Sequence, residues 1–237
     1  MQYSTPLIPA RLVRRYKRFL ADMVLEDGTE ITAHCANPGA MLALAEPGRR
    51  CWLSHDPNPK RKLSHSWELE DTPSGCVGIN TARANAVVAE ALARGAIPEL
   101  ARWPQIRREA ADGAGSRLDF HLTAPDGSRC WLEVKSVTLS RSPGLAEWPD
   151  ARSARGLRHL ESLSALAGAG AGAALLFLVQ RPDCTTFQVA ADIDPAYARA
   201  LAAIRTQPEG AKPLILVYDC NVSPAGIEFR RSLAIIP

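Results

Sequence analysis

Short runs of strand-compatible residues follow one another through the first third of the chain, with turn sequences between them. The runs 11–25 and 30–35 flank Glu26-Asp27-Gly28, and this arrangement predicts a β-hairpin. Further short strands are expected at 51–53 and 67–70, separated by loops that contain Pro, Asn and Lys. Several short strands without a long helix are typical of a small barrel, so residues 1–80 are predicted to form an OB-like β-barrel domain.

The hydrophobic pattern changes at about residue 80, after which helical periodicity alternates with strand-like runs. Helices are expected at 81–93, 152–166 and about 195–204, and strands at 106–110, 118–122, 130–137, 173–179 and 214–218. Asp126-Gly127 supplies a hairpin turn between the second and third of these strands. The run 173–179 is apolar throughout, as expected of a strand that is covered on both faces. Residues 81–237 are therefore predicted to form a second domain, of α/β (α+β) class, with strands of mixed direction.

The composition is that of a folded globular protein. Hydrophobic residues make up 46% of the chain and charged residues 22%, which is enough to bury a sizeable core. The six cysteines lie far apart without zinc-ligand spacing, so reduced, mostly buried thiols are expected. The N-terminus lacks a signal-peptide pattern, and no stretch approaches the roughly 20 apolar residues of a membrane helix. We therefore expect a cytoplasmic protein without a membrane partner; its oligomeric state is left open.

Basic residues are distributed unevenly, although the net charge is only +3. The first segment comprises Arg14, Arg15, Lys17 and Arg18, and the second comprises Lys60, Arg61 and Lys62. Clustered Lys and Arg side chains are suited to contacts with backbone phosphates. DNA is therefore the expected partner, and because no recognition helix of known type is present, both double- and single-stranded forms stay open.

The most informative chemical pattern is Asp119 on one predicted strand and Glu133-Val134-Lys135 on the next. Side chains two residues apart on a strand point to the same face, and Asp119 can meet them from the neighbouring strand. Two carboxylates provide hard oxygen ligands for Mg²⁺ or Mn²⁺, and the lysine can orient or activate a water beside a phosphate. The alternative is a salt-bridge ladder on the surface of a hairpin.

Two further acidic residues are candidates for the same metal cluster. Glu109 lies on the preceding strand, and Glu90 lies on the first predicted helix of this domain. Either could instead be a solvated surface charge, and for Glu90 that interpretation is preferred. Glu109 is retained as a candidate catalytic residue.

The start of the helix predicted at 152–166 carries a second polar group. Arg155 and His159 are four residues apart and share a helical face, so they can point together at a phosphate or a metal-bound water. Asp150 precedes them. In the alternative interpretation, Asp150 or Ser153 caps the helix while Arg155 and His159 lie on its surface.

Asp119 followed by Glu133-x-Lys135 resembles the PD-(D/E)-x-K nuclease signature, with Leu118 in place of the nominal proline. Blocks along nearly the whole chain, in the same order, resemble the sugar fermentation stimulation protein A (SfsA) family. They are 15–22, 35–41, 60–62 with 67–68, 80–81, 116–120, 133–139, 149–151, 155–156 and 159–160. Pro38 departs from the threonine of many relatives, which affects only the local loop.

This resemblance implies an N-terminal OB-like barrel, a C-terminal domain of PD-(D/E)XK nuclease fold, DNA binding and a role in regulating sugar (maltose) metabolism. It matches Asp119, Glu133 and Lys135 to the nuclease-like motif and the basic run 14–18 to a strand that faces nucleic acid. Two functions stay open: a magnesium-dependent nuclease, and a DNA-binding regulator that keeps the nuclease fold as a scaffold. The aromatic residues Tyr16, Phe19, Trp52 and Trp67 either stack on bases or fill the barrel core.

Overall fold

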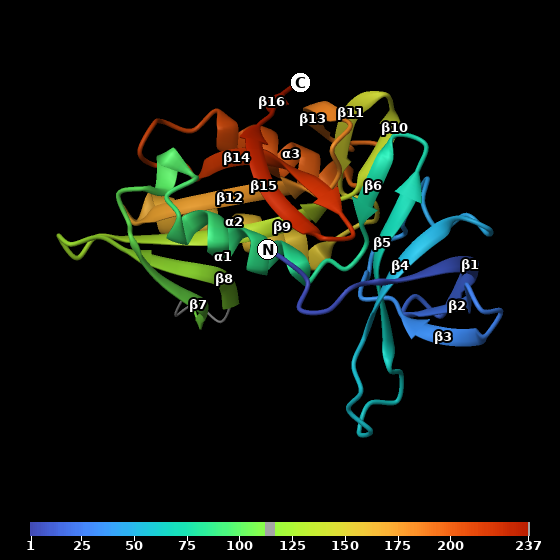
Figure 1. Cartoon of the computed structure of the whole chain (residues 1–237). Helices are drawn as coiled ribbons and strands as arrows, with labels where there is room; N and C mark the ends of the chain where they lie inside the picture. Colours follow the sequence, from blue (N-terminus) through green and yellow to red (C-terminus); the bar gives the residue numbers. More distant parts are fainter. Residues whose placement is uncertain (112–116, 237) are drawn as a thin grey trace.

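The computed structural model describes residues 1–111 and 117–236 and places a β-barrel beside a larger domain that contains helices and a mixed sheet (Figure 1). The barrel strands are β1 (Ile8–Tyr16), β2 (Leu20–Leu25), β3 (Glu30–His34), β4 (Arg50–His55) and β5 (His65–Thr72), and β6 (Gly75–Gly78) extends the sheet. Their order is β3-β2-β1-β4-β5-β6, and a β3–β5 pairing between His34 and Ser66 closes five of them into a barrel. The predicted OB-like barrel is confirmed.

The prediction of one hairpin over 11–25 and 30–35 is wrong in detail, because two successive hairpins occupy this region. The chain reverses between β1 and β2, where Lys17 and Arg18 have φ values of 45° and 64°. Residues other than glycine rarely adopt positive φ, and turns are usually marked by glycine or proline. The sequence has neither residue at this position, so the turn could not be predicted from it. Barrel closure imposes the turn, since the inward-facing residues Leu12 and Met23 are both buried in the barrel core.

The second domain has a central six-stranded sheet with the order β15-β14-β12-β9-β8-β7. Its strands are β7 (Gln105–Ala111), β8 (Arg117–Thr123), β9 (Arg129–Val137), β12 (Gly172–Val179), β14 (Leu214–Ser223) and β15 (Gly226–Ser232). A smaller sheet, β10-β11-β13-β16, comprises β10 (Leu139–Ser142), β11 (Gly144–Trp148), β13 (Cys184–Val189) and β16 (Ala234–Ile235). Strand β12 is parallel to β9 and β14 whereas β7, β8 and β15 pair antiparallel, so the predicted mixed directions are confirmed.

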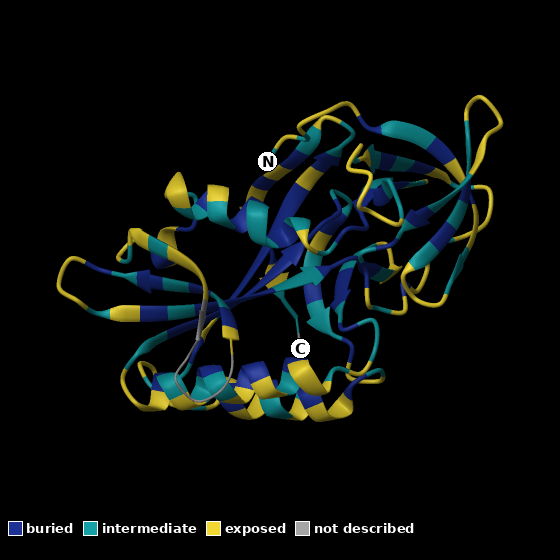
Figure 2. Cartoon of the chain, turned by 90° about the horizontal axis from the view of Figure 1, so that it is seen from below, coloured by how far each residue is buried: buried dark blue, intermediate teal, exposed yellow. Residues whose placement is uncertain are grey.

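Helices cover both faces of the central sheet, as the view in Figure 2 shows. The helices are α1 (Arg83–Ala93), α2 (Ala154–Gly168) and α3 (Pro195–Arg205), with a 3₁₀ turn at Pro98–Leu100. On β12, Leu176 and Leu178 pack in the cluster that contains α1, whereas Leu175 and Phe177 pack in the cluster of α2 and α3. This two-sided burial explains why the run 173–179 is apolar without alternation.

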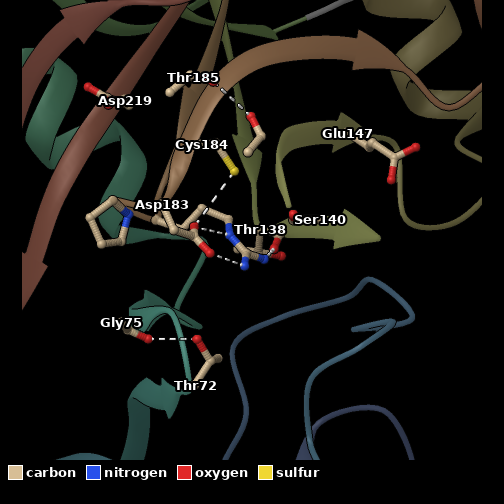
Figure 3. A network of polar contacts seen from close by, with 12 residues as sticks. Thr72, Gly75, Thr138, Ser140, Glu147, Asp183, Cys184, Thr185 and Asp219 are labelled. Atoms are coloured by element: carbon tan, nitrogen blue, oxygen red, sulfur yellow. Dashed lines mark hydrogen bonds and ion pairs between the residues drawn. The ribbon is translucent and has the colours of Figure 1, made fainter. Parts of the chain in front are cut away.

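The segment 180–183 of the second domain is held in place near the end of β9 and contacts the barrel. The buried guanidinium of Arg181 donates two hydrogen bonds of 2.7 Å to Asp183 and one of 2.8 Å to the carbonyl of Thr138 (Figure 3). Gly75, in the turn between β5 and β6, lies against Pro182, and the amide of Gly78 donates to the carbonyl of Gln180. The barrel is therefore fixed beside the edge of the sheet where β9 and β12 end. In the part of the chain that is described, no helix is both long and apolar enough to cross a membrane.

Candidate active site

Strands β8 and β9 separate at the position of the predicted carboxylates. Their register runs from Thr123 and Arg129 to Phe120 and Leu132, and Asp119 and Glu133 are the next residues along the two strands. Beyond this point Asp119 substitutes for the backbone ladder, because its Oδ2 accepts a hydrogen bond of 2.8 Å from the amide of Val134. The strands diverge here, and this opens space for a site between them.

Asp119 is held from two sides and is partly buried. Its Oδ1 accepts a hydrogen bond of 2.7 Å from Nδ2 of Asn85 on α1, while Oδ2 is held by Val134. Burial, together with the negative charge of Glu133, raises the pKa of Asp119 to about 6. Two carboxylates close enough to shift each other's ionisation repel one another, and a cation between them would relieve that repulsion.

Glu133 is buried, with only 4% of its surface exposed. One oxygen, Oε1, accepts a hydrogen bond of 2.6 Å from Nζ of Lys135 and another from Nδ1 of His159. Burial raises the pKa of Glu133, but the contacts with His159 and Lys135 outweigh it and lower the pKa below its usual value. The other oxygen, Oε2, is buried and has no hydrogen-bond partner within the described residues.

His159 connects Glu133 to Arg155 on α2. Nε of Arg155 can only donate, and it lies 3.3 Å from Nε2 of His159, so Nε2 must act as the acceptor. The ring proton is therefore assigned to Nδ1, which donates to Glu133. Nζ of Lys135 lies 3.3 Å from the same Nδ1. The imidazole thus orients the carboxylate and leaves its second oxygen free to point elsewhere.

The donor set fits a hard divalent cation with an incomplete protein shell. Among the described residues, no group of three or more His, Cys, Asp and Glu side chains is arranged to enclose a metal ion. Mg²⁺ in phosphate-processing sites is held by one or two carboxylates and completes its shell with waters and substrate oxygens. Asp119 and the unpartnered Oε2 of Glu133 could supply those carboxylate ligands.

The site opens into a cleft of about 570 Å³ that is lined by both domains. The barrel contributes Arg18 and the loop around Gly39, and the second domain contributes Asp119, Glu133 and Lys135. Arg152 and Arg155, at the start of α2, also line it; both are exposed. The cleft therefore brings basic side chains to its walls and the carboxylates to its base.

The first basic segment divides into residues with internal partners and residues that face outwards. Arg15 donates to four backbone carbonyls, those of Arg18, Asn37, Gly39 and Ala40, and so holds the turn against the loop. Arg14, at the surface, pairs with Asp22 at 2.9 Å. Lys17 and Arg18 are exposed at the turn, and Arg18 faces the cleft.

The second basic segment, Lys60, Arg61 and Lys62, lies in the exposed loop between β4 and β5, which projects from the barrel (Figure 1). Arg61 pairs with Asp56 at 2.9 Å and donates to Ser66. The described lining of the cleft includes none of the three. Any contact of this loop with DNA would therefore lie outside the cleft.

The structure does not bring Glu109 or Glu90 into the carboxylate cluster. The side chain of Glu109 is 69% exposed and lies 3.7 Å from Arg117. Glu90 pairs with the α-amino group of Met1 at 2.7 Å and with Arg94 at 3.8 Å. The prediction that Glu109 joins Asp119 and Glu133 is therefore corrected, because an exposed residue near the end of an edge strand can turn outwards.

Two contacts near the site were not predicted from the sequence: that of Asn85 with Asp119, and that of Asp150 with the barrel. Asn85 is a poor helix former in an otherwise Ala- and Val-rich helix, and this could have marked it as a residue with a specific partner. Asp150 does not cap α2, since that role belongs to Ser153, whose hydroxyl accepts from Gly156. Instead Oδ2 of Asp150 accepts a hydrogen bond of 2.9 Å from the amide of Met41 in the barrel.

The aromatic residues of the barrel differ in exposure. Trp67 is buried in the core, and its Nε1 donates to the carbonyl of Leu69. Trp52 and Tyr16 are partly buried and donate to Asp71 and Asp22, respectively. Phe19 is 43% exposed. For Trp67 the core interpretation is confirmed, while Phe19 is left available to a ligand.

Comparison with known proteins gives matches over both domains. Residues 13–79 match the family model described as the SfsA N-terminal OB domain, and residues 82–226 match the one described as the sugar fermentation stimulation protein RE domain. A sugar fermentation stimulation protein homolog from Ruegeria pomeroyi is 52% identical over 229 residues, which cover 96% of this chain and 98% of the relative. A homolog from Rhodospirillum centenum is 50% identical over 233 residues, 98% of each chain.

A solved structure has the same architecture. The SfsA of Pyrococcus furiosus, determined in complex with Ca²⁺, aligns with a TM-score of 0.88 at 26% identity. The alignment covers 100% of this chain and 98% of that protein. The predicted pairing of an OB-like barrel with a second domain built on a mixed sheet is therefore confirmed.

Proposed function

The chain belongs to the sugar fermentation stimulation protein family, and from that premise we propose that it hydrolyses phosphodiester bonds in DNA with the help of Mg²⁺ or Mn²⁺. The observation that carries the proposal is the buried, unpartnered Oε2 of Glu133 beside Asp119. An unsatisfied buried carboxylate oxygen costs free energy unless something binds it. A divalent cation satisfies both this oxygen and the crowded charge of Asp119.

Asp119 and Glu133 would hold the cation, which when bound would supply charge stabilisation at the phosphate and a water of lowered pKa. The Ca²⁺ complex of the Pyrococcus protein supports a hard divalent cation in this fold. Lys135 places an ammonium group at the base of the cleft, where it can orient a water or offset negative charge on the phosphate. His159 positions Glu133 by occupying its other oxygen.

DNA binding would come from exposed basic residues on both sides of this site. Arg18 on the barrel and Arg155 on α2 both line the cleft. Lys17, Lys60 and Lys62 are exposed on the barrel, where they can contact phosphates further along the nucleic acid. Arg14 and Arg61 have carboxylate partners already and are expected to contribute less.

A second function, that of a non-catalytic DNA-binding regulator of sugar (maltose) metabolism, is favoured by one feature of the same site. Lys135, Glu133 and His159 form a connected network of contacts among protein side chains. Such a network can stabilise a fold that serves only as a scaffold. In that case the basic residues would bind DNA, and no bond would be broken.

Cleavage assays separate these functions. Plasmid and single-stranded DNA are incubated with Mg²⁺, Mn²⁺ or EDTA, using the wild type, Lys135→Ala and the control Glu109→Ala. A nuclease requires cleavage that EDTA abolishes, that Lys135→Ala lowers by about 10²- to 10³-fold, the cost of losing one positioned donor, and that Glu109→Ala leaves unchanged. If all three proteins bind DNA and none cuts it, the regulator is supported and the nuclease is excluded.

We place this function in the cytoplasm. All six cysteines lie within the described part of the chain, and each is a free thiol. Burial raises the pKa of Cys130 to about 12, so this thiol stays protonated and unreactive. A protein with many unpaired thiols fits a reducing compartment. Fractionation of cells that express the protein at its natural level tests this placement.

A further inference from the structure

We propose that the nucleic acid enters the site as a single strand, with a phosphate held by Arg18 in the cleft and the adjoining base stacked on Phe19, the next residue of the chain. This inference rests on the proposed function, since it names the substrate form that the same site accepts. It concerns recognition, however, and can be tested by binding alone.

Phe19 is exposed at the surface, where its aromatic side chain does not form part of the barrel core. The described residues include four large hydrophobic side chains that are exposed, namely Val13, Phe19, Leu42 and Leu214, and Phe19 is the aromatic one among them. Its ring lies 6.5 Å from the ring of His34, which provides a second flat surface nearby. Exposed aromatic side chains beside basic residues are the usual platform for unpaired bases.

Hydrogen bonds hold the turn that carries Phe19 against the loop that lines the cleft. Lys17 and Arg18 both have positive φ, and the amide of Phe19 donates to the carbonyl of Lys17 at 2.7 Å. The carbonyl of Phe19 accepts from the amide of Cys35, at the start of the loop that lines the cleft. Arg15 joins the turn to the same loop. Strained backbone that surrounding contacts hold in place is typical of functional positions.

The size and depth of the cleft favour one strand over two. Its volume of about 570 Å³ is that of a pocket for a drug-sized ligand, which corresponds to about one or two nucleotides. The side chains of Glu133 and Lys135 are only 5% and 11% exposed, so a phosphate must enter the cleft to reach them. A duplex would have to bring its second strand into the same space between the barrel and α2.

The charges along the cleft also suit a single backbone. Arg18 from the barrel and Arg152 and Arg155 from the second domain all line the cleft. A strand that follows the cleft would meet these side chains in turn, and a base next to the phosphate held by Arg18 could reach the neighbouring Phe19. Bases can do so only when they are unpaired.

Binding is measured by fluorescence anisotropy in EDTA, so that cleavage cannot interfere. The probes are a labelled oligothymidylate and a duplex of the same length, and the variants are Phe19→Leu, Phe19→Trp and the control Val13→Ala. Wild type should bind the single strand more tightly than the duplex. Phe19→Leu should weaken single-strand binding by about 5- to 150-fold, the range for loss of one base–aromatic stack. Phe19→Trp should retain the binding, and Val13→Ala should match wild type.

Equal affinity for the two probes, or no effect of Phe19→Leu, would overturn the inference. Phe19 is on the surface, so equal thermal midpoints for the variants and wild type exclude unfolding as the cause of any loss. Cleavage is read separately. Absence of metal-dependent cutting, with the single-strand preference intact, refutes the proposed hydrolysis alone. Cutting within duplex DNA that Phe19→Leu does not affect refutes the single-strand inference alone.

Discussion

The contact between Gly39 and Asp150 allows the coupling of the two domains to be tested with a single methyl group. A Cβ atom added at Gly39 would lie 2.2 and 2.4 Å from the carboxylate oxygens of Asp150, far inside van der Waals contact. Gly39 is not among the residues with positive φ, so alanine is compatible with its backbone. The substitution must therefore displace Asp150 from its hydrogen bond of 2.9 Å with the amide of Met41.

The expected cost follows from that bond. A hydrogen bond to a charged acceptor contributes about 1.5–3 kcal/mol, and each kcal/mol shifts the thermal midpoint of a chain of this size by about 2–4 °C. Gly39→Ala should therefore lower the midpoint by about 3–12 °C in a thermal melt followed by circular dichroism. Gly168→Ala is the matched control, because its Cβ meets nothing within 4 Å. It should leave the midpoint unchanged or raise it slightly.

A double-mutant cycle identifies the mechanism. Asp150→Ala removes the same hydrogen bond and also the obstacle, so Gly39→Ala should cost little in the Asp150→Ala background. The coupling energy should then be about as large as the single effects. Additive losses would show that the clash with Asp150 is not the cause, and would refute this account of how the domains are joined.

Three further predictions concern the site and the basic turn. Because the pKa of Asp119 is raised to about 6, this residue keeps a proton in the metal-free folded protein that it loses in the unfolded chain, so the contribution of Asp119 to stability should fall with a negative slope as pH rises from about 4 to 6. Thermal melts in EDTA should show this slope reduced in Asp119→Asn, and an equal slope would refute the assignment. Asn85→Ala should weaken Mn²⁺ binding by about 10- to 100-fold in calorimetric titration, as loss of a supporting hydrogen bond does, whereas Glu109→Ala should not; equal effects would contradict the geometry. Lys17→Ala should reduce the salt dependence of DNA binding by about one unit of slope without changing the thermal midpoint, whereas Arg15→Ala should lower the midpoint because four carbonyls lose their donor. If Lys17→Ala lowered the thermal midpoint and Arg15→Ala changed only the salt dependence, Lys17 would be the structural residue and Arg15 the phosphate contact.

The elements with a strong hydrophobic pattern could be predicted, and those without one could not. The helix expected at 152–166 is α2 (Ala154–Gly168), and the apolar run 173–179 is β12. The smaller sheet was missed. Its strands β10 and β16 span four and two residues, too short to show a period. The burial pattern of β13 does not alternate strictly, and its partner β11 lies in a distant segment of the chain.

Taken alone, the sequence determined the class of each domain and the motif Asp119, Glu133 and Lys135, because periodicity and residue type are local properties. It could not determine which side chains meet. Asp150 lies 109 residues from Met41, whose amide donates a hydrogen bond to it. Asn85, on helix α1, donates a hydrogen bond to Asp119 at the point where strands β8 and β9 separate. Only the tertiary structure decides such contacts, because they depend on how the packed elements place distant backbones relative to one another. The tertiary structure also decided which basic side chains bind other parts of the chain and which stay exposed and can bind phosphate.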